Sequence, residues 1–323
     1  MTLRLTVSRA TWRSQIAEIA ASTPGLVPVV KGNGYGLGQD LLMSIAVELS
    51  DTVAVGSIHE VASVPTGTDV MVLTPVGAPP DRENVILTVG SHAHVDALDG
   101  WSGRVLVKLA SSMRRYGETP GELAALLDHV DSAGLTLAGF SVHPPTETTE
   151  EARVDEILRW TERIREQIAD GDATALVVTV SHLAPETFRA LRSQHQDVEW
   201  RLRSGTALWH GDKRSLHLGA DVLDVRTVRA GDRVGYRQIP VAHGGTVAMI
   251  GAGDINGVVP LLAGGGAPRS PFHFRRRRLD LLEIHMHTSM VLIPEDLEPP
   301  RFGDSVDVQR PLIGTFIDEL VWR

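Results

Sequence analysis

A lysine followed by a glycine-rich turn is the segment of this sequence best suited to covalent chemistry. Residues 29–38 read VVKGNGYGLG, so that Lys31 ends an apolar run. An amine shielded from water at such a place has a lowered pKa and can form a Schiff base with a carbonyl compound. The glycines let the backbone approach a ligand, and the Tyr35 hydroxyl can bind a phosphate. The alternative interpretation is a lysine that leaves a strand into solvent above a glycine turn.

The elements around Lys31 predict a barrel. Short apolar runs alternate with helix-like stretches from about residue 26 to residue 205, and apolar residues recur at helical spacing most clearly in Thr149–Ala169. Such runs are typical of parallel strands covered on both faces. The expected strands are Leu26–Val30, Thr52–Gly56, Asp69–Thr74, Asn84–Thr88, Arg104–Ala110, Thr136–His143, Ala175–His182 and Val198–Arg203. This pattern favours a (β/α)8 TIM-type barrel, with its active site at the carboxyl ends of the strands. A doubly wound open sheet is the main alternative.

After about Lys213 the pattern changes to short strands separated by glycine, proline and aspartate turns. No helix of convincing length separates them, which predicts a smaller all-β domain. The expected strands are Val222–Val228, Thr246–Ile250, Leu281–Met286 and Ser305–Val308. We therefore expect a barrel over residues 1–212 and a β domain over residues 213–323.

The composition argues against several classes of protein. The chain has 323 residues, of which 42% are hydrophobic and 22% charged, as in folded globular proteins. It has no cysteine, which excludes disulfides, thiolate zinc sites and a cysteine nucleophile. A net charge of −9 argues against nucleic acid as a partner. No apolar run approaches the ~18 residues of a membrane span and no signal peptide is visible, so we expect a cytoplasmic protein with no membrane partner.

The lysine segment resembles the alanine racemase family, fold-type III pyridoxal-phosphate enzymes whose motif reads K-A-N-A-Y-G-H-G. The matching residues are Lys31, Asn33, Tyr35, Gly36 and Gly38. Further segments are similar to family motifs in the same order: 55–60 (VGSIHE), 107–117 (VKLASSMRRYG), 139–143 (GFSVH), 203–209 (RSGTALW) and 230–236 (AGDRVGY). The resemblance therefore covers nearly the whole chain.

This resemblance implies that the cofactor is pyridoxal 5'-phosphate, that the substrate is a small amino acid and that the chain forms a homodimer. Lys31 would form the Schiff base and transfer a proton. Tyr35, with the backbone of Gly205 and Thr206, would hold the phosphate.

The resemblance also implies roles for the charged residues of the later motifs. Arg203 would face the pyridine nitrogen, and His182 would orient Arg203. Arg115 would contact the ring hydroxyl or the substrate carboxylate, steadied by Lys108, which the family often carries as a carbamate. His143 would lie near the ring. Two simpler interpretations stay open, namely that Lys108 is an ion-pair partner at the barrel rim and that His143 is a hydrogen-bonded turn residue.

The sequence departs from the family where a second base is needed. Racemisation requires proton transfer on both faces of the substrate carbanion. The family takes the second base from the tyrosine of the partner subunit's I-G-Y-A-D-G motif, but the aligned residue here is Ala252. Tyr236 matches a different family position. His287 stands where the family has aspartate, and its ordinary pKa would suit a base. His285 and His287 are expected on one strand face, but no third ligand accompanies them, so we expect no metal site.

Two further departures concern the cofactor. Glu186 falls near the family serine that contacts the phosphate, and the chain ends at Trp322-Arg323 without the family's R-V-P-R-x-Y segment. Three functions remain open. The first is a racemase-like enzyme, and the second is a pyridoxal-phosphate enzyme for decarboxylation, elimination or transamination, which need only one base. The third is a catalytically inactive paralogue that binds a cofactor or a partner.

Overall fold

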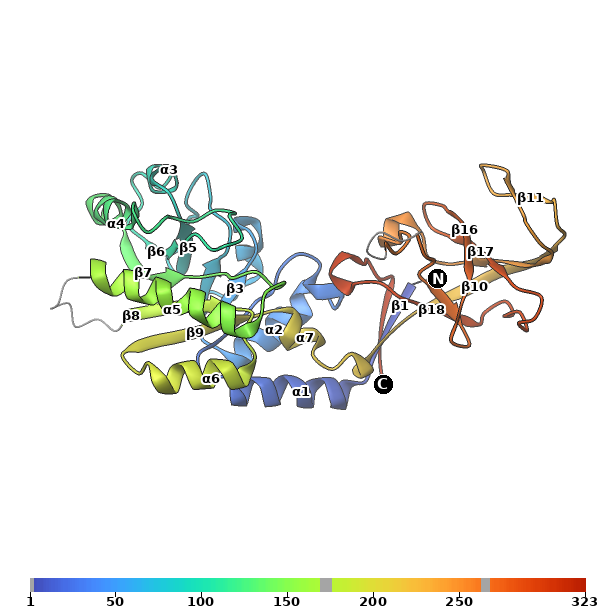
Figure 1. Ribbon diagram of the computed structural model, residues 1–323, viewed down its shortest axis with the longest axis horizontal. Coiled ribbons are helices and arrows are strands. Elements are labelled where there is room, and N and C mark those ends of the chain that lie inside the picture. The colour runs from blue at the N-terminus through green and yellow to red at the C-terminus, as the bar shows by residue number, and fades with distance from the viewer. Residues whose placement is uncertain (1–2, 169–175, 263–267) are drawn as a thin grey trace. The chain divides into compact units, whose positions relative to one another are not determined.

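The computed structural model describes residues 3–168, 176–262 and 268–323, which form two compact units (Figure 1). One unit comprises residues 1–14, 35–37 and 212–323, and the other comprises residues 15–34 and 38–211. Two predicted element ends, Ala169 and Ala175, lie outside the described residues. Among the described helices, none is both long and apolar enough to span a bilayer. The domain boundary expected between residues 212 and 213 stays a prediction.

The larger unit is a parallel eight-stranded barrel, as the apolar runs predicted. Its strands are β2 (Leu26–Pro28), β3 (Thr52–Val55), β4 (Asp69–Val72), β5 (Val85–Val89), β6 (Arg104–Lys108), β7 (Thr136–Ser141), β8 (Leu176–Ser181) and β9 (Val198–Ser204). They are ordered β2-β9-β8-β7-β6-β5-β4-β3, and every pairing is parallel. A parallel bridge between Val29 and Ala54 closes the sheet on itself. We call this part the α/β unit.

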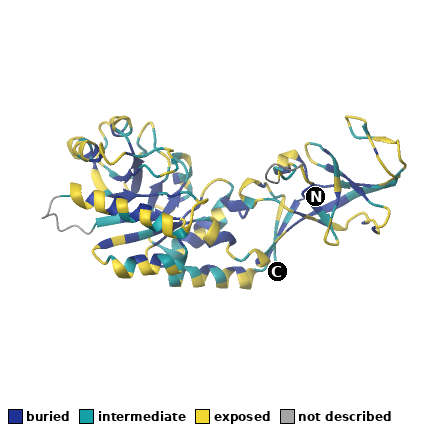
Figure 2. Cartoon of the chain, viewed as in Figure 1, coloured by how far each residue is buried: buried dark blue, intermediate teal, exposed yellow. Residues whose placement is uncertain are grey.

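Apolar side chains fill the inside of this barrel. The central cluster consists of Val27, Val29, Ala54, Met71, Ile86 and Leu106. Figure 2 shows the strands of this unit as mostly buried, with the helices exposing their outer faces. The barrel is therefore a packed scaffold, and residues at the strand ends are held on rigid elements.

Helices cover the outside of the strands (Figure 1). They are α1 (Arg9–Ser22), α2 (Gln39–Leu49), α3 (His92–Asp96), α4 (Leu123–Ser132), α5 (Glu150–Gln167), α6 (Pro185–Gln194) and α7 (Thr206–His210). Helix α5 begins after Thr149, whose side chain accepts a hydrogen bond from the Ala152 N–H at 3.2 Å. Its buried residues Ile157, Trp160 and Ile164 recur at helical spacing and form the face that packs inward.

The smaller unit is all-β, as expected. Its strands are β1 (Leu3–Val7), β10 (Leu216–Val228), β11 (Arg233–Val234), β12 (Ile239–Pro240), β13 (Gly245–Ile250), β14 (Phe272–Phe274), β15 (Arg277–Arg278), β16 (Asp280–Ile284), β17 (Ser289–Ile293), β18 (Ser305–Val308) and β19 (Glu319–Trp322). The main sheet runs β15-β14-β18-β10-β13-β17-β16. Strand β1 joins it antiparallel to β10 and parallel to β19. The amino-terminal strand therefore belongs to this unit.

Candidate functional site

Lys31 follows β2 at the carboxyl-terminal end of the barrel. A carboxylate holds the turn that carries it. Glu60, in the 3-10 helix Ile58–Ser63, accepts hydrogen bonds from the Gly32 N–H at 2.5 Å and the Ser57 N–H at 2.8 Å. The Gly34 N–H donates to the Lys31 carbonyl at 3.2 Å. The lysine backbone is therefore fixed between two loops of the barrel mouth.

The Lys31 amine is electrostatically destabilised in its charged form. Its pKa is lowered from the ordinary lysine value, first by burial of the amine and then by the charges of Arg115 and Arg203, while Glu60 acts in the opposite direction. The residue as a whole is exposed. A lysine with these properties can act as a nucleophile and as a proton acceptor.

Lys108 ends β6 inside the barrel and has an unusual environment. It is only 4% exposed, and burial, followed by Arg203 and Arg115, lowers its pKa to about 6. In the strand register Lys108 pairs with Ser141, which pairs with Thr179. The Nζ, Oγ and Oγ1 atoms of these residues are buried and have no hydrogen-bond partner in the described chain. The ion-pair interpretation of Lys108 thus finds no partner within hydrogen-bond distance there.

Arg115 lies in the loop after β6 and is held by its neighbour. Its guanidinium carbon lies 4.7 Å from the ring centre of Tyr116, and its Nη2 donates to the Tyr116 hydroxyl at 3.4 Å. That hydroxyl in turn donates to the carbonyl of Leu73, beyond β4, at 2.8 Å. Tyr116 therefore links Arg115 to the end of β4, which is separated from β6 by β5 in the sheet.

Helix α5 fixes the same loop from the other side. The buried Glu156 carboxylate accepts from the Ser112 N–H at 2.5 Å and from the Ser112 hydroxyl at 2.9 Å. Trp160 Nε1 donates to the carbonyl of Ala110 at 2.9 Å. Glu156 also raises the pKa of Lys108, against the larger effects that lower it. One face of helix α5 therefore supports the Arg115 loop in addition to the contact through Tyr116.

We expect Glu156→Gln to lower the free energy of unfolding by about 1–3 kcal/mol, because a buried charge-assisted hydrogen bond is replaced by a weaker one. Urea denaturation measures this change, and limited proteolysis should cut residues 111–117 faster. The matched control is Glu166→Gln on the same helix, whose exposed carboxylate pairs with Arg163 at 2.8 Å. The control should change stability by less than about 0.5 kcal/mol. Equal effects of the two variants would contradict the role assigned to Glu156.

Arg203 and two histidines complete the cluster of predicted residues. Arg203, the last residue but one of β9, is buried and donates to the carbonyl of Val142 at 3.0 Å. Burial lowers its pKa to about 10, so it remains protonated at neutral pH.

The two histidines lie near this arginine. Burial, followed by Arg203 and His182, lowers the pKa of His143 to about 2, so its imidazole is neutral. The Ser181 hydroxyl lies within hydrogen-bond distance of His143 Nδ1, at 2.5 Å. His182 contacts the Pro144 carbonyl through Nδ1 at 2.8 Å.

The residues expected at the phosphate begin helix α7. Gly205 precedes the helix and Thr206 is its first residue. Backbone N–H groups in a first helical turn have no partner inside the helix and can bind an anion. Glu186, the anticipated obstacle, begins α6 with a side chain 76% exposed, 3.7 Å from Arg189. Its charge is therefore partly neutralised and largely screened by water.

The structure places the other predicted residues in the all-β unit. Tyr35 is buried there, and so is Ala252, whose carbonyl accepts from the Ser289 hydroxyl at 2.7 Å. The prediction that His285 and His287 share one face of a strand is wrong, because β16 ends at Ile284 and neither histidine belongs to it. His287 is exposed in the following turn, whereas His285 is half-buried and contacts a carboxylate. No group of three or more His, Asp or Glu suited to a metal occurs among the described residues.

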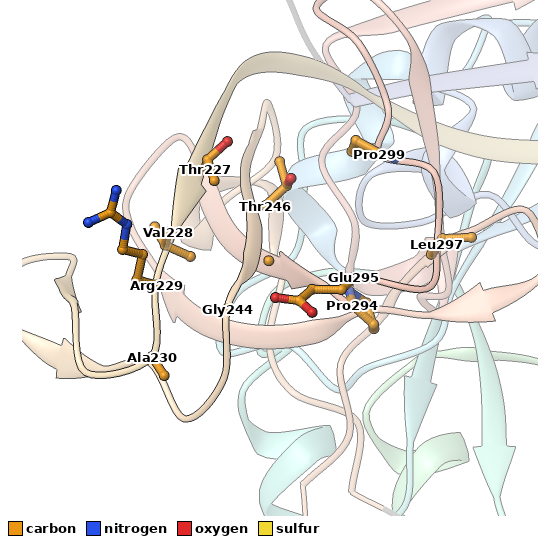
Figure 3. Close-up of a pocket in the computed structure, with 11 residues that line it drawn as sticks. Thr227, Val228, Arg229, Ala230, Gly244, Thr246, Pro294, Glu295, Leu297 and Pro299 are labelled. Carbon is orange, nitrogen blue, oxygen red and sulfur yellow. The ribbon is translucent and has the colours of Figure 1, made fainter.

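A pocket of about 550 Å³ also lies in the all-β unit (Figure 3). Its charged lining residues are Arg229, which points away from the other labelled side chains, and Glu295. None of the predicted catalytic or cofactor-binding residues lines it, although Ala230 of the segment 230–236 does. The predicted site residues around Lys31, Lys108, Arg115 and Arg203 are therefore not part of this pocket.

Solved structures of similar fold cover all or nearly all of the chain. One is the alanine racemase of Clostridium difficile 630, with 16% identity, a TM-score of 0.74 and coverage of 100% of this chain and 96% of that one. Another is the alanine racemase of Bartonella henselae with covalently bound pyridoxal phosphate, with 17% identity, a TM-score of 0.75 and complete coverage of both chains. A third, from Bacillus anthracis with bound L-Ala-P, has 21% identity, a TM-score of 0.71 and coverage of 95% and 85%. These likenesses establish the fold.

The sequence itself identifies the family. Among curated proteins, none matches it significantly. The family model described as alanine racemase, N-terminal domain, matches residues 7–212, which is more than half of the chain. The chain therefore belongs to the alanine racemase family.

Proposed function

We propose that this protein is a pyridoxal-phosphate-dependent isomerase, a racemase-like enzyme acting on a small amino acid. One observation carries the proposal. Lys31 stands at the carboxyl-terminal end of a closed parallel barrel, exposed at the rim, with a pKa lowered by burial of its amine and by Arg115 and Arg203. This is where the fold places active sites, and it is the chemistry that a lysine nucleophile needs.

The residues present fit an anionic cofactor. Lys108 Nζ and Arg203 Nε are buried and have no partner in the described chain. Arg115 and Arg203 place two guanidinium charges near Lys31. When bound, pyridoxal phosphate withdraws electrons from the α-carbon of an amino acid and makes its α-proton acidic. Gly205 and Thr206 would donate backbone N–H groups to the phosphate. The family motif, rather than a contact, supports the same role for Tyr35.

The charged residues have separate tasks in this proposal. The Lys31 amine, neutral at a lower pH than an ordinary lysine, would bind the cofactor covalently and then accept or return the α-proton. Arg203 would face the pyridine nitrogen. Because a guanidinium donates but cannot accept protons, Arg203 would keep that nitrogen unprotonated. Arg115 would hold the substrate carboxylate, and Tyr116 would hold Arg115.

Ala252 supports a second candidate function. Its methyl group cannot transfer a proton, so the family's second base is missing at this position. Decarboxylation, elimination and transamination need one base on one face, which Lys31 provides. Both candidates share the cofactor and the lysine, and they differ in whether a second group transfers a proton.

We infer that the protein acts as a homodimer, and the surface of the all-β unit supports this. Large apolar side chains are exposed at Tyr236 (85%), Met286 (68%), Ile255 (53%) and Phe316 (62%). The Ile255 N–H bonds to the Met286 carbonyl at 3.0 Å, and the Phe316 N–H bonds to the carbonyl of the residue after Ile255 at 3.2 Å, so these segments adjoin. We call these four residues the apolar strip. Clustered exposed apolar side chains mark protein interfaces.

The test of the proposed function is the visible absorbance of the purified protein mixed with pyridoxal phosphate, before and after borohydride. We expect a yellow band that borohydride removes while fixing the cofactor on Lys31, as peptide mapping would show. An amino-acid screen then measures two readouts. Loss of optical rotation indicates racemisation, whereas release of CO2 or a keto acid indicates the second candidate function. If no yellow band forms and the cofactor is lost on washing, the proposal is overturned. The protein would then be an inactive binding protein.

A further inference from the structure

A buried carboxylate and a histidine form a hydrogen-bonded pair in the all-β unit. Glu283, on β16, contacts His285 Nε2 through Oε2 at 3.1 Å and accepts from the Tyr236 N–H at 2.7 Å. The exposed fractions of the two side chains are 6% for Glu283 and 16% for His285. An ionised carboxylate only accepts hydrogen bonds, so it places the proton of His285 on Nε2. Nδ1 then carries a lone pair, as a general base requires.

The His285 ring is held on its other sides as well. The ring centre of Tyr236 lies 4.6 Å away at an angle of 52°, and the Thr288 hydroxyl lies 3.4 Å from Nδ1. At 3.4 Å this last contact is too long for a strong hydrogen bond and leaves Nδ1 able to accept a proton. The imidazole is thus oriented by its neighbours, while Nδ1 makes only this one long contact among the described residues.

This pair lies beside the position where the family's second base is missing. The Asp254 N–H bonds to the His285 carbonyl at 2.9 Å, and the Ser289 hydroxyl bonds to the Ala252 carbonyl at 2.7 Å. The turn that carries His285 therefore packs against the segment 252–254. Its next residue, Met286, belongs to the apolar strip, so His285 lies at the edge of the surface that we assign to the second copy.

We propose that His285, oriented by Glu283, is the second proton-transfer residue and that it is supplied to the Lys31 site of a second copy of the chain. This inference rests on the proposed function and names the group that replaces the phenol missing at Ala252. The occupant of the apolar strip is then a second copy, because the strip is the surface that the proposed homodimer would bury and His285 lies at its edge. The Glu283 carboxylate also lies near a cation of its own unit, because its Oε1 is 3.7 Å from Arg237 Nε.

The proton balance of the reaction is simple. In one direction Lys31 accepts the α-proton on one face, and protonated His285 donates a proton to the opposite face. In the other direction the two residues exchange roles. Water restores both protonation states between turnovers, so no further reactant is needed.

The first experiment compares His285→Asn with the wild type in deuterium oxide, using alanine enantiomers as the probe. Loss of a general acid–base group costs about 100- to 10,000-fold, so racemisation should fall at least a hundredfold. The yellow band of the Lys31-linked cofactor should persist, and exchange of the α-proton of one enantiomer should continue. Glu283→Gln should lower racemisation less, and His243→Asn, an exposed histidine of the same unit, should change neither readout.

The outcomes separate the two proposals. If the wild-type protein gives no yellow band, the proposed function itself is contradicted. A band with unchanged racemisation in His285→Asn, or loss in His287→Asn while His285→Asn stays active, overturns only the role of His285. A wild type that binds the cofactor but exchanges the α-proton of one enantiomer alone also overturns it, because a single base then acts.

A second experiment tests the exchange between copies and does not depend on turnover. Since the chain has no cysteine, His287→Cys and Met113→Cys can be introduced on separate chains, next to His285 and Arg115 respectively. A short bis-maleimide should cross-link the two chains only when they are mixed. In parallel, mixing Lys31→Ala with His285→Asn chains should restore racemisation. Absence of both the cross-link and the restoration would exclude the supply of His285 by a second copy.

Discussion

The Lys31→Ala variant is expected to lose the borohydride-reducible yellow band and to slow any amino-acid turnover by at least about a thousandfold. The variant removes the nucleophile and a proton-transfer group together, and each such role is worth orders of magnitude. The alanine should fold normally, because Lys31 is exposed and the turn is held by backbone groups on Glu60. Absorbance after gel filtration, followed by peptide mapping, measures the loss.

The chain offers a matched control for this prediction. It has only three lysines, and Lys213 is exposed in the all-β unit. Lys213→Ala should therefore keep the band and the turnover. A band that survives in Lys31→Ala with the cofactor mapped to Lys108 would transfer the covalent role to that lysine. A band that survives without any lysine adduct would contradict the assignment of the chemistry.

The barrel was predictable because its strands are buried on both faces. Each of the eight apolar runs became a parallel strand, with ends that differ by at most two residues from those expected. Lys31 was predictable because the glycines after it indicate a turn at a strand end. Strand β1 was not expected, although Leu3, Leu5 and Val7 alternate with less buried residues in the pattern of a half-buried strand.

The supports of the site were harder to predict because they connect distant parts of the chain. Ser112 and Glu156 are 44 residues apart, and Tyr116 and Leu73 are 43 apart. Such contacts depend on which segments meet at the end of the barrel once it closes. Glu60 differs, since its spacing of three from Ser57 is that of a capping box, and the spacing alone indicates the local hydrogen bond.

The histidines show where a periodicity rule fails. Two residues that are two apart share a face only inside a regular strand. Strand β16 ends before His285, and its pairing with β17 shifts register between Leu281 and Glu283. His285 is therefore turned toward Glu283 while His287 is exposed, which sequence spacing could not distinguish.

Lys108→Met is expected to stabilise the protein in the absence of cofactor, and the gain should depend on pH. The pKa of Lys108 is lowered from 10.5 to about 6 in the folded chain. Between these two values the unfolded chain holds a proton that the folded chain does not, so the lysine's contribution to stability falls as the pH falls from 10.5 toward 6. Each pKa unit corresponds to about 1.4 kcal/mol. At pH 7 the lysine should therefore cost several kcal/mol, which methionine of similar length avoids.

The measurement is the free energy of unfolding of both proteins from pH 7 to pH 10, from urea denaturation. The stabilisation by Lys108→Met should shrink steadily as the pH rises, because the unfolded lysine then also loses its proton. Lys213→Met, at an exposed site, should show little change at any pH. A difference that does not vary with pH would mean that Lys108 keeps a charge in the folded chain.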